Sequence, residues 1–237
     1  MQMYQAYPEF EINLQHILNV VADNCLEIAT DKSGCCVLQQ CVAHAKGEPQ
    51  IRLLAEIVAN ALVLSEHPYG NYVVQFIVSL KMPQVTADIL EQLAGNYVSL
   101  STNKYGSNVV EKCMKESSED QAMQIIDEII RSKSFLAVLQ DAYGNYVAQS
   151  AYAIAKGPIR QAMVNLIQMH YSYLHSHPHG KRVLAKTRGG GGGAGKLRKE
   201  HKATKLAVSQ LVCNQANTSL PEIPKPDFAE ARDSHVG

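Results

Sequence analysis

Four pairs of side chains have the types and the spacing to act as hydrogen-bonding forks. In each pair the first residue directly follows a glycine and the second stands four residues further on. Residues i and i+4 of an α-helix share one face, so two polar groups placed there can contact one flat ligand together. The pairs are Cys35 with Gln39, Asn71 with Gln75, Ser107 with Glu111, and Asn145 with Gln149.

Another residue follows the first member of each pair, and at two of the four places it is a tyrosine. These residues are Cys36, Tyr72, Asn108 and Tyr146. Aromatic faces stack on the bases of single-stranded nucleic acids, whose edges remain open to hydrogen-bonding groups. The pattern therefore indicates a ladder of polar forks separated by flat side chains.

No arrangement typical of a catalytic or metal site accompanies the forks. We find no Ser/His/Asp set, no pair of acids for hydrolysis and no phosphate-binding loop. Four histidines lie close together, but their spacing matches no standard zinc pattern and no cysteine is near them. These are His170, His175, His177 and His179. We therefore predict no enzyme, no metal and no cofactor.

The forks belong to an internal repeat, marked by glycines at successive spacings of 36, 36, 38 and 36 residues. We number positions from these glycines, so that +1 is the residue that follows. Position +3 is always valine and position +4 is always apolar, so both are expected to face the core. The glycines are Gly34, Gly70, Gly106, Gly144 and Gly180, and the valines are Val37, Val73, Val109, Val147 and Val183.

Within each unit the apolar residues recur at steps of three and four, as in residues 51–59 and 122–130. This spacing predicts helices, and the polar and proline residues before each glycine predict a turn. One unit cannot bury its own apolar face, so the units must stack into an all-α solenoid. With positions +3 and +4 in the core, the fork residues at +1 and +5 are expected to point outward.

The composition limits which kinds of partner and which cellular compartment we expect for this protein. The chain has 22 Lys and Arg against 22 Asp and Glu, which excludes binding driven by a large basic excess. No apolar run is long enough to span a membrane and the first residues do not resemble a signal peptide. Six cysteines without a C-x-x-C pair favour reduced thiols. We expect a soluble protein of the cytoplasm, with the nucleus as the alternative and no membrane partner.

The two ends differ from the repeats. Residues 1–9 show no repeat and are expected to form an N-terminal extension. Residues 189–195 are glycine with one alanine, which is typical of a flexible linker. Residues 196–237 combine a basic cluster with a proline-rich end and are expected to be disordered. The repeats therefore occupy residues 10–188.

The forks, the residues between them and the period resemble the repeats of the Pumilio (PUF) family. The resemblance is to the C-terminal half of a plant-like Pumilio homology domain, with four full repeats and a terminal half-repeat at Gly180. It implies a right-handed, armadillo-like superhelix that is truncated relative to the family's usual array. It also implies a monomer that binds single-stranded RNA, without catalytic activity.

In the family, positions +1 and +5 contact the edge of one base and position +2 stacks on it. The resemblance gives that stacking role to Cys36, Tyr72, Asn108 and Tyr146. It implies uracil for Asn71 with Gln75 and for Asn145 with Gln149, guanine for Ser107 with Glu111, and adenine for Cys35 with Gln39. Because the family binds RNA antiparallel to its repeats, the implied sequence is 5′-UGUA-3′.

The unit at Gly180 has Lys181 and Ala185 at the fork positions. We interpret it as a cap, in which Lys181 and Arg182 contact a phosphate at most. The resemblance further implies targets in 3′ untranslated regions of messenger RNA, with regulation of translation and stability through recruited repression or decay proteins. The alternatives are a solenoid scaffold that binds an extended peptide on the same ladder, and a truncated product that binds nothing.

Overall fold

The structure is a computed structural model that describes residues 8–188. The expected linker at 189–195 and tail at 196–237 lie outside the described residues, as do residues 1–7 of the expected N-terminal extension. Every regular element in the described part is a helix. None of these helices is long and apolar enough to cross a membrane.

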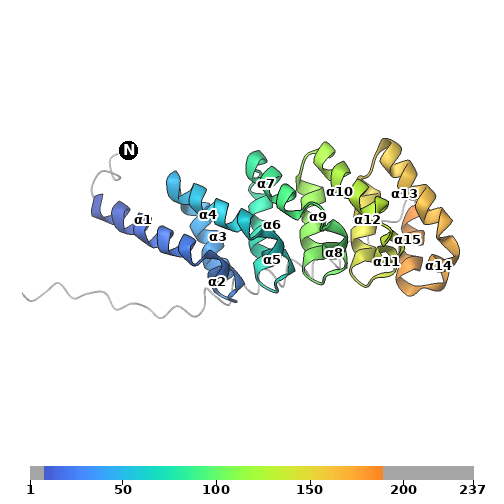
Figure 1. The fold of residues 1–237 in the computed structure, drawn as a ribbon, viewed down its shortest axis with the longest axis horizontal. Helices are drawn as coiled ribbons and strands as arrows, with labels where there is room; N and C mark the ends of the chain where they lie inside the picture. Colours follow the sequence, from blue (N-terminus) through green and yellow to red (C-terminus); the bar gives the residue numbers. More distant parts are fainter. Residues whose placement is uncertain (1–7, 189–237) are drawn as a thin grey trace, which may run out of the picture.

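The fifteen helices of the described part follow one another in five trios, arranged in a single elongated row (Figure 1). The first helices are α1 (Pro8–Asp23), α4 (Glu48–Ala59), α7 (Pro83–Leu93), α10 (Glu119–Arg131) and α13 (Gly157–Met169). The short second helices are α2 (Cys25–Thr30), α5 (Ala61–Glu66), α8 (Tyr97–Thr102), α11 (Phe135–Gln140) and α14 (Tyr171–Ser176). The third helices are α3 (Gly34–His44), α6 (Gly70–Ser79), α9 (Gly106–Glu116), α12 (Gly144–Ile154) and α15 (Pro178–Arg188). The predicted helical repeat is confirmed.

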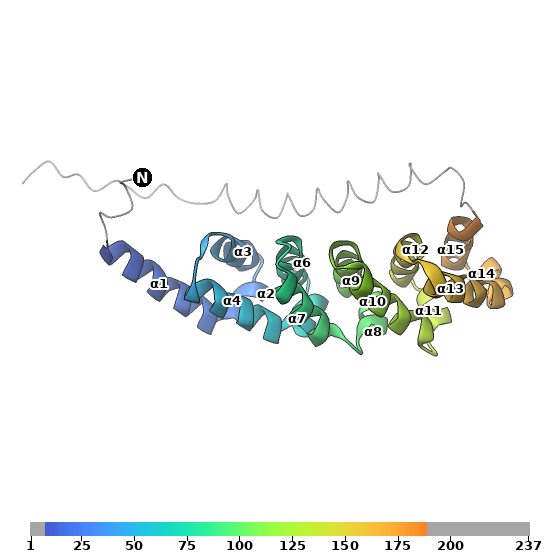
Figure 2. The ribbon, with the colours of Figure 1, turned by 90° about the horizontal axis from the view of Figure 1, so that it is seen from above.

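The third helices lie along one side of the row, as the view from above shows (Figure 2). Each packs against its neighbours, in the order α3, α6, α9, α12 and α15. We call this set the third-helix layer. Because all four predicted forks lie on third helices, the stacking of the repeats places the forks in one line.

The valines at position +3 show which side of a third helix faces the preceding repeat. Four of them are fully buried, namely Val73, Val109, Val147 and Val183. Val37 is 53 % exposed, so its assignment to the core was wrong. The reason is that no third helix precedes α3 in the described part of the chain, so nothing there covers this side of α3.

A close approach between the second and third helices requires glycine at or near the start of each third helix. A Cβ atom added to Gly70 would lie 2.9 Å from the carbonyl oxygen of Leu64, and one added to Gly144 would lie 2.5 Å from that of Val138. Real Cβ atoms do not come so near to a backbone oxygen, so any larger residue would push the two helices apart. The glycine thus fixes the angle at which the third helix leaves the turn.

A side chain three positions before the glycine closes the same turn. The Oδ1 atom of Asn103 accepts hydrogen bonds from the backbone N–H groups of Tyr105, at 2.8 Å, and Gly106, at 2.9 Å. Asp31 and Asp141 accept equivalent bonds, and the Nδ1 atom of His67 does so at longer distances. The N–H groups of Gly34 and Ser33 hold the pKa of the Asp31 carboxyl below its usual value. The sequence pattern predicts the turn, but these hydrogen bonds are seen only in the structure.

We expect Asn103→Ala to destabilise the fold, because two backbone N–H groups at the start of α9 lose their acceptor. Loss of a cap of this kind costs about 1 kcal/mol of the free energy of unfolding, measured by chemical denaturation. Asn103→Asp is the matched control, since aspartate already fills this position at Asp31 and Asp141. Equal destabilisation by both substitutions would show that the side-chain acceptor does not hold the turn.

Candidate nucleic-acid interface

The third-helix layer brings the predicted site residues together, but the first member of each fork does not point outward. Asn71 is 1 % exposed, and Cys35, Ser107 and Asn145 are buried as well. The outward orientation predicted for position +1 was therefore wrong. In a helix the Cα–Cβ bonds tilt toward the N-terminus, so a residue next to the starting glycine is directed back over the turn.

The two asparagine–glutamine forks share one hydrogen-bond pattern. The Nδ2 group of Asn71 donates to the backbone oxygens of His67, at 2.7 Å, and Pro68, at 2.9 Å. Its Oδ1 atom accepts a hydrogen bond of 2.9 Å from Nε2 of Gln75. Asn145 donates to the carbonyls of the equivalent turn and accepts from Gln149 at 3.1 Å.

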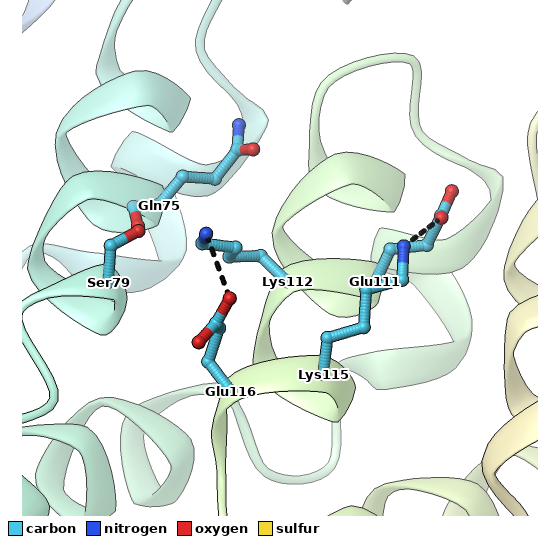
Figure 3. Close-up of polar contacts among 6 residues, drawn as sticks. All are labelled: Gln75, Ser79, Glu111, Lys112, Lys115 and Glu116. Carbon is cyan, nitrogen blue, oxygen red and sulfur yellow. Dashed lines mark hydrogen bonds and ion pairs between the residues drawn. The ribbon is translucent and has the colours of Figure 1, made fainter. Parts of the chain in front are cut away.

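This pattern assigns different roles to the two members of a fork. The buried asparagine ties the glutamine to the turn, whereas the glutamine is half-buried, and Figure 3 shows the side chain of Gln75 extending away from its helix. An amide group has two donor hydrogens and a carbonyl oxygen, so one bond to asparagine does not exhaust it. Gln75 and Gln149 are thus held in position and retain the capacity to bind a polar edge.

The carboxylate of the Ser107 and Glu111 fork has partners on two helices. Glu111 is 8 % exposed, and its Oε2 atom accepts hydrogen bonds from Nζ of Lys115, at 2.7 Å, and Oγ of Ser150, at 2.9 Å. Figure 3 shows the carboxylate of Glu111 beside the ammonium group of Lys115 on α9. The spacing of Glu111 and Lys115 is an ordinary i,i+4 signal, but Ser150 lies 39 residues away and gave none.

The fork of Cys35 and Gln39 is arranged differently. The Sγ atom of Cys35 donates to the backbone oxygen of Lys32 at 3.4 Å. The side chain of Gln39 donates to the backbone oxygen of Cys35 at 3.0 Å instead of to a neighbouring side chain. The cysteine side chain offers no oxygen acceptor, so this glutamine is bound to the backbone of its own helix and not to the side chain of the first fork member.

The residues at position +2 lie on adjacent helices of the layer and are all partly exposed, as the stacking role requires. They are Cys36, Tyr72, Asn108 and Tyr146. Burial raises the pKa of the Tyr72 phenol above its usual value. The next residue in this line, Arg182, is exposed and donates a hydrogen bond of 3.2 Å from Nη1 to the hydroxyl of Tyr146. Lys181 is exposed as well.

The histidine group forms ring contacts. Tyr171 and His175 stack with their ring centres 5.6 Å apart, and the rings of His177 and His179 lie tilted at the same separation. Among the residues that the structure describes, no group of three or more His, Cys, Asp or Glu side chains is placed to hold a metal ion.

The model of the Pumilio-family RNA binding repeat matches residues 24–58, 60–80, 96–130 and 134–167. The chain belongs to the Pumilio family. Each match starts at a second helix and includes the third helix that follows, so the four Pumilio matches contain the four predicted forks.

Curated Pumilio proteins show the same similarity. The chain is 45 % identical to Pumilio homolog 12 of Arabidopsis thaliana over 162 residues, which are 68 % of this chain and 27 % of that protein. It is 41 % identical to putative pumilio homolog 7, chloroplastic, of the same plant over 170 residues, or 72 % of this chain and 26 % of the relative. The matched part of the chain thus spans about a quarter of the length of these relatives.

Solved Pumilio-type structures have the same fold. The Puf4 RNA-binding domain bound to the 3′ UTR recognition sequence of HO endonuclease RNA matches with a TM-score of 0.67 and 32 % identity, over 73 % of this chain and 57 % of that one. PUF-8 in complex with PBE-RNA matches with a TM-score of 0.67 and 25 % identity, over 74 % of this chain and 53 % of that one. The Pumilio solenoid predicted from the repeats is confirmed.

Proposed function

We propose that this Pumilio chain binds single-stranded RNA that contains 5′-UGUA-3′. The observation that carries the proposal is the line of four forks on the third-helix layer, each next to a partly exposed residue at position +2. Stacking and edge recognition at regular intervals suit a single strand whose bases are splayed apart. The RNA bound by the Puf4 and PUF-8 domains supports the same class of ligand.

The chemistry of the forks supports the order of the bases. Glu111 is the one carboxylate among the four residues at position +5, and a carboxylate accepts both the N1–H and the N2–H of guanine. The glutamines beside Asn71 and Asn145 offer the donor and the acceptor that uracil requires. Gln39, beside Cys35, has only an apolar neighbour in its fork, and we assign this fork to adenine.

The charge of the repeats favours base contacts over phosphate contacts as the source of affinity. Residues 1–188 contain 15 Lys and Arg against 17 Asp and Glu, so the repeats carry no basic excess. Stacking contributes about 1–3 kcal/mol per base, and four bases suffice for detectable binding after the cost of ordering the strand. We propose that the targets are 3′ untranslated regions of messenger RNAs in the cytoplasm. Binding there would regulate the translation and stability of these messenger RNAs through recruited proteins.

Substitution of the tyrosines at position +2 distinguishes RNA binding from the alternative of a peptide scaffold. We expect Tyr72→Ala and Tyr146→Ala each to weaken RNA binding by about 1–3 kcal/mol, because a base loses one stacking face. The fold should persist, since Val73, Val147 and the other core residues of these helices are untouched. Tyr146→Phe is the control, because it keeps the ring and removes only the hydroxyl that Arg182 contacts. Fluorescence anisotropy measures the affinities, and unchanged RNA binding in both alanine variants would favour the scaffold.

Exchanging one fork should change the base that is read. Ser107→Asn combined with Glu111→Gln copies the pair found in both flanking repeats, where asparagine orients the glutamine. We expect this double variant to prefer UUUA over UGUA, with discrimination shifted by about 1–3 kcal/mol. Competition among the four oligonucleotides UNUA measures the preference. A double variant that still ranks guanine first would show that these two residues do not read the base.

A further inference from the structure

Glu111 is held by groups outside its own fork, unlike the glutamines at position +5 of the flanking forks. One partner, Lys115, lies one turn further along α9, and the other, Ser150, lies on α12 of the next repeat. Both donate to the same oxygen, Oε2, of a carboxylate that is almost completely buried. The side chains of Gln75 and Gln149, in contrast, each donate to the asparagine of their own fork.

The positions of Lys115 and Ser150 have equivalents in every repeat, and their residue types differ at the carboxylate fork. Position +9 is Lys115 beside Glu111, whereas it is alanine or serine beside the three glutamines, namely Ala43, Ser79 and Ala153. Position +6 of the following repeat is Ser150 for Glu111, and Phe76, Lys112 and Lys186 for the glutamines. The repeat with the carboxylate is thus the one with a cation one turn away and a hydroxyl across the repeat boundary.

The side of the helix explains why position +6 reaches the preceding repeat. Positions +3 and +6 are three residues apart and share one side of the third helix. Val147 at +3 is fully buried, and Ser150 at +6 donates to Glu111 on α9. Figure 3 shows the same direction in α9, where Lys112 at +6 extends toward Gln75 and Ser79 on α6.

A nearly buried carboxylate needs such partners to stay ionised and in one orientation. Without a cation and a hydrogen-bond donor, burial favours the protonated carboxyl group. A protonated carboxyl group offers a donor as well as an acceptor, as the amide group of glutamine does, and therefore suits uracil as well as guanine. A carboxylate free to rotate also loses entropy when it binds a base, whereas one that is already oriented does not.

We propose that Lys115 and Ser150 are positioning residues that set the guanine preference of the Glu111 fork. This inference rests on the proposed function, because it assigns the two residues to the reading of the second base of UGUA. Lys115 compensates the charge of the carboxylate, and Ser150 links its orientation to the packing of α12 against α9. Guanine selection is then a property of two adjacent repeats and not of one.

The test compares the ratio of affinities for UGUA and UUUA oligonucleotides in the full chain. Lys115→Met keeps most of the side-chain stem and removes the ammonium group, so we expect the ratio to fall about five-fold, as befits a half-exposed ion pair. Lys112→Met is the matched control, because it removes the same charge from the same helix but breaks only the pair with Glu116, drawn in Figure 3. Its ratio should equal that of the unsubstituted chain, and Lys115→Arg should restore most of the preference.

The cross-repeat contact is tested in the same assay. Ser150→Ala should lower the ratio about three-fold, which is the order expected for one hydrogen bond, and Ser150→Thr should restore it. In a Glu111→Gln background, Lys115→Met should leave the ratio unchanged, because the carboxylate on which Lys115 acts is no longer present. If Lys115→Met acted by a general loss of stability, the ratio would change in this background as well. Thermal melting of each variant accompanies the binding data.

The outcomes separate this inference from the proposed function. If the unsubstituted chain binds UGUA and UUUA equally, the proposed function fails, and this inference fails with it. If the chain prefers UGUA and Lys115→Met and Ser150→Ala both keep the full ratio, the inference alone is overturned. A ratio that rises in Lys115→Met would also overturn it, because Lys115 would then compete with guanine for Glu111.

Discussion

The close contact between the start of each third helix and the carbonyl group six residues before it governs the geometry of this solenoid. At Gly70 and Gly144 a Cβ atom would collide with that carbonyl oxygen, so the turn tolerates only glycine. A side chain three residues earlier closes the same turn by accepting its backbone N–H groups, as Asn103 does. Together they give the third helices a common starting geometry, and regular stacking then places equivalent residues in line.

The role of each residue in the layer follows from its distance from that glycine. Position +1 lies over the turn, so Asn71 is buried. It connects Gln75 to the turn by hydrogen bonds. Position +5 comes one helical turn later, where the glutamines are half-buried and Glu111 is nearly buried, and position +2 stays partly exposed beside it. Positions +3 and +6 face the preceding repeat, with Val147 in the core and Ser150 at the neighbouring fork. A contact surface built in this way is shared between repeats.

The repeat and the layer were predictable because they depend on spacing. The glycine period, the valines at +3 and the polar pairs at +1 and +5 gave the helices, the stacking and the line of forks. The burial of Asn71 was not predictable from period alone, because it depends on the direction of the first side chain after the turn. The exposure of Val37 depends on what precedes α3, and the bond from Ser150 to Glu111 joins residues distant in sequence.

The surroundings of the Glu111 carboxylate also could not be predicted without the structure. The i,i+4 spacing of Glu111 and Lys115 is compatible with an ion pair, but such pairs are common on exposed helix faces and contribute little there. Only the burial of the carboxylate, with Ser150 as a second donor, distinguishes this pair from an ordinary surface contact. Similar spacing between Lys112 and Glu116 yields an ion pair in which neither residue is a fork residue (Figure 3).

The most direct test is the affinity of the unsubstituted chain for a labelled UGUA oligonucleotide and for the same strand with UCUA. Cytosine presents an acceptor at N3 and an exocyclic amino donor, so its edge cannot give Glu111 the two adjacent hydrogens of guanine. We predict that UGUA binds about ten-fold more tightly or better, in line with the 1–3 kcal/mol or so that one well-matched base contact contributes. Equal affinity for the two strands would contradict base reading by the third-helix layer.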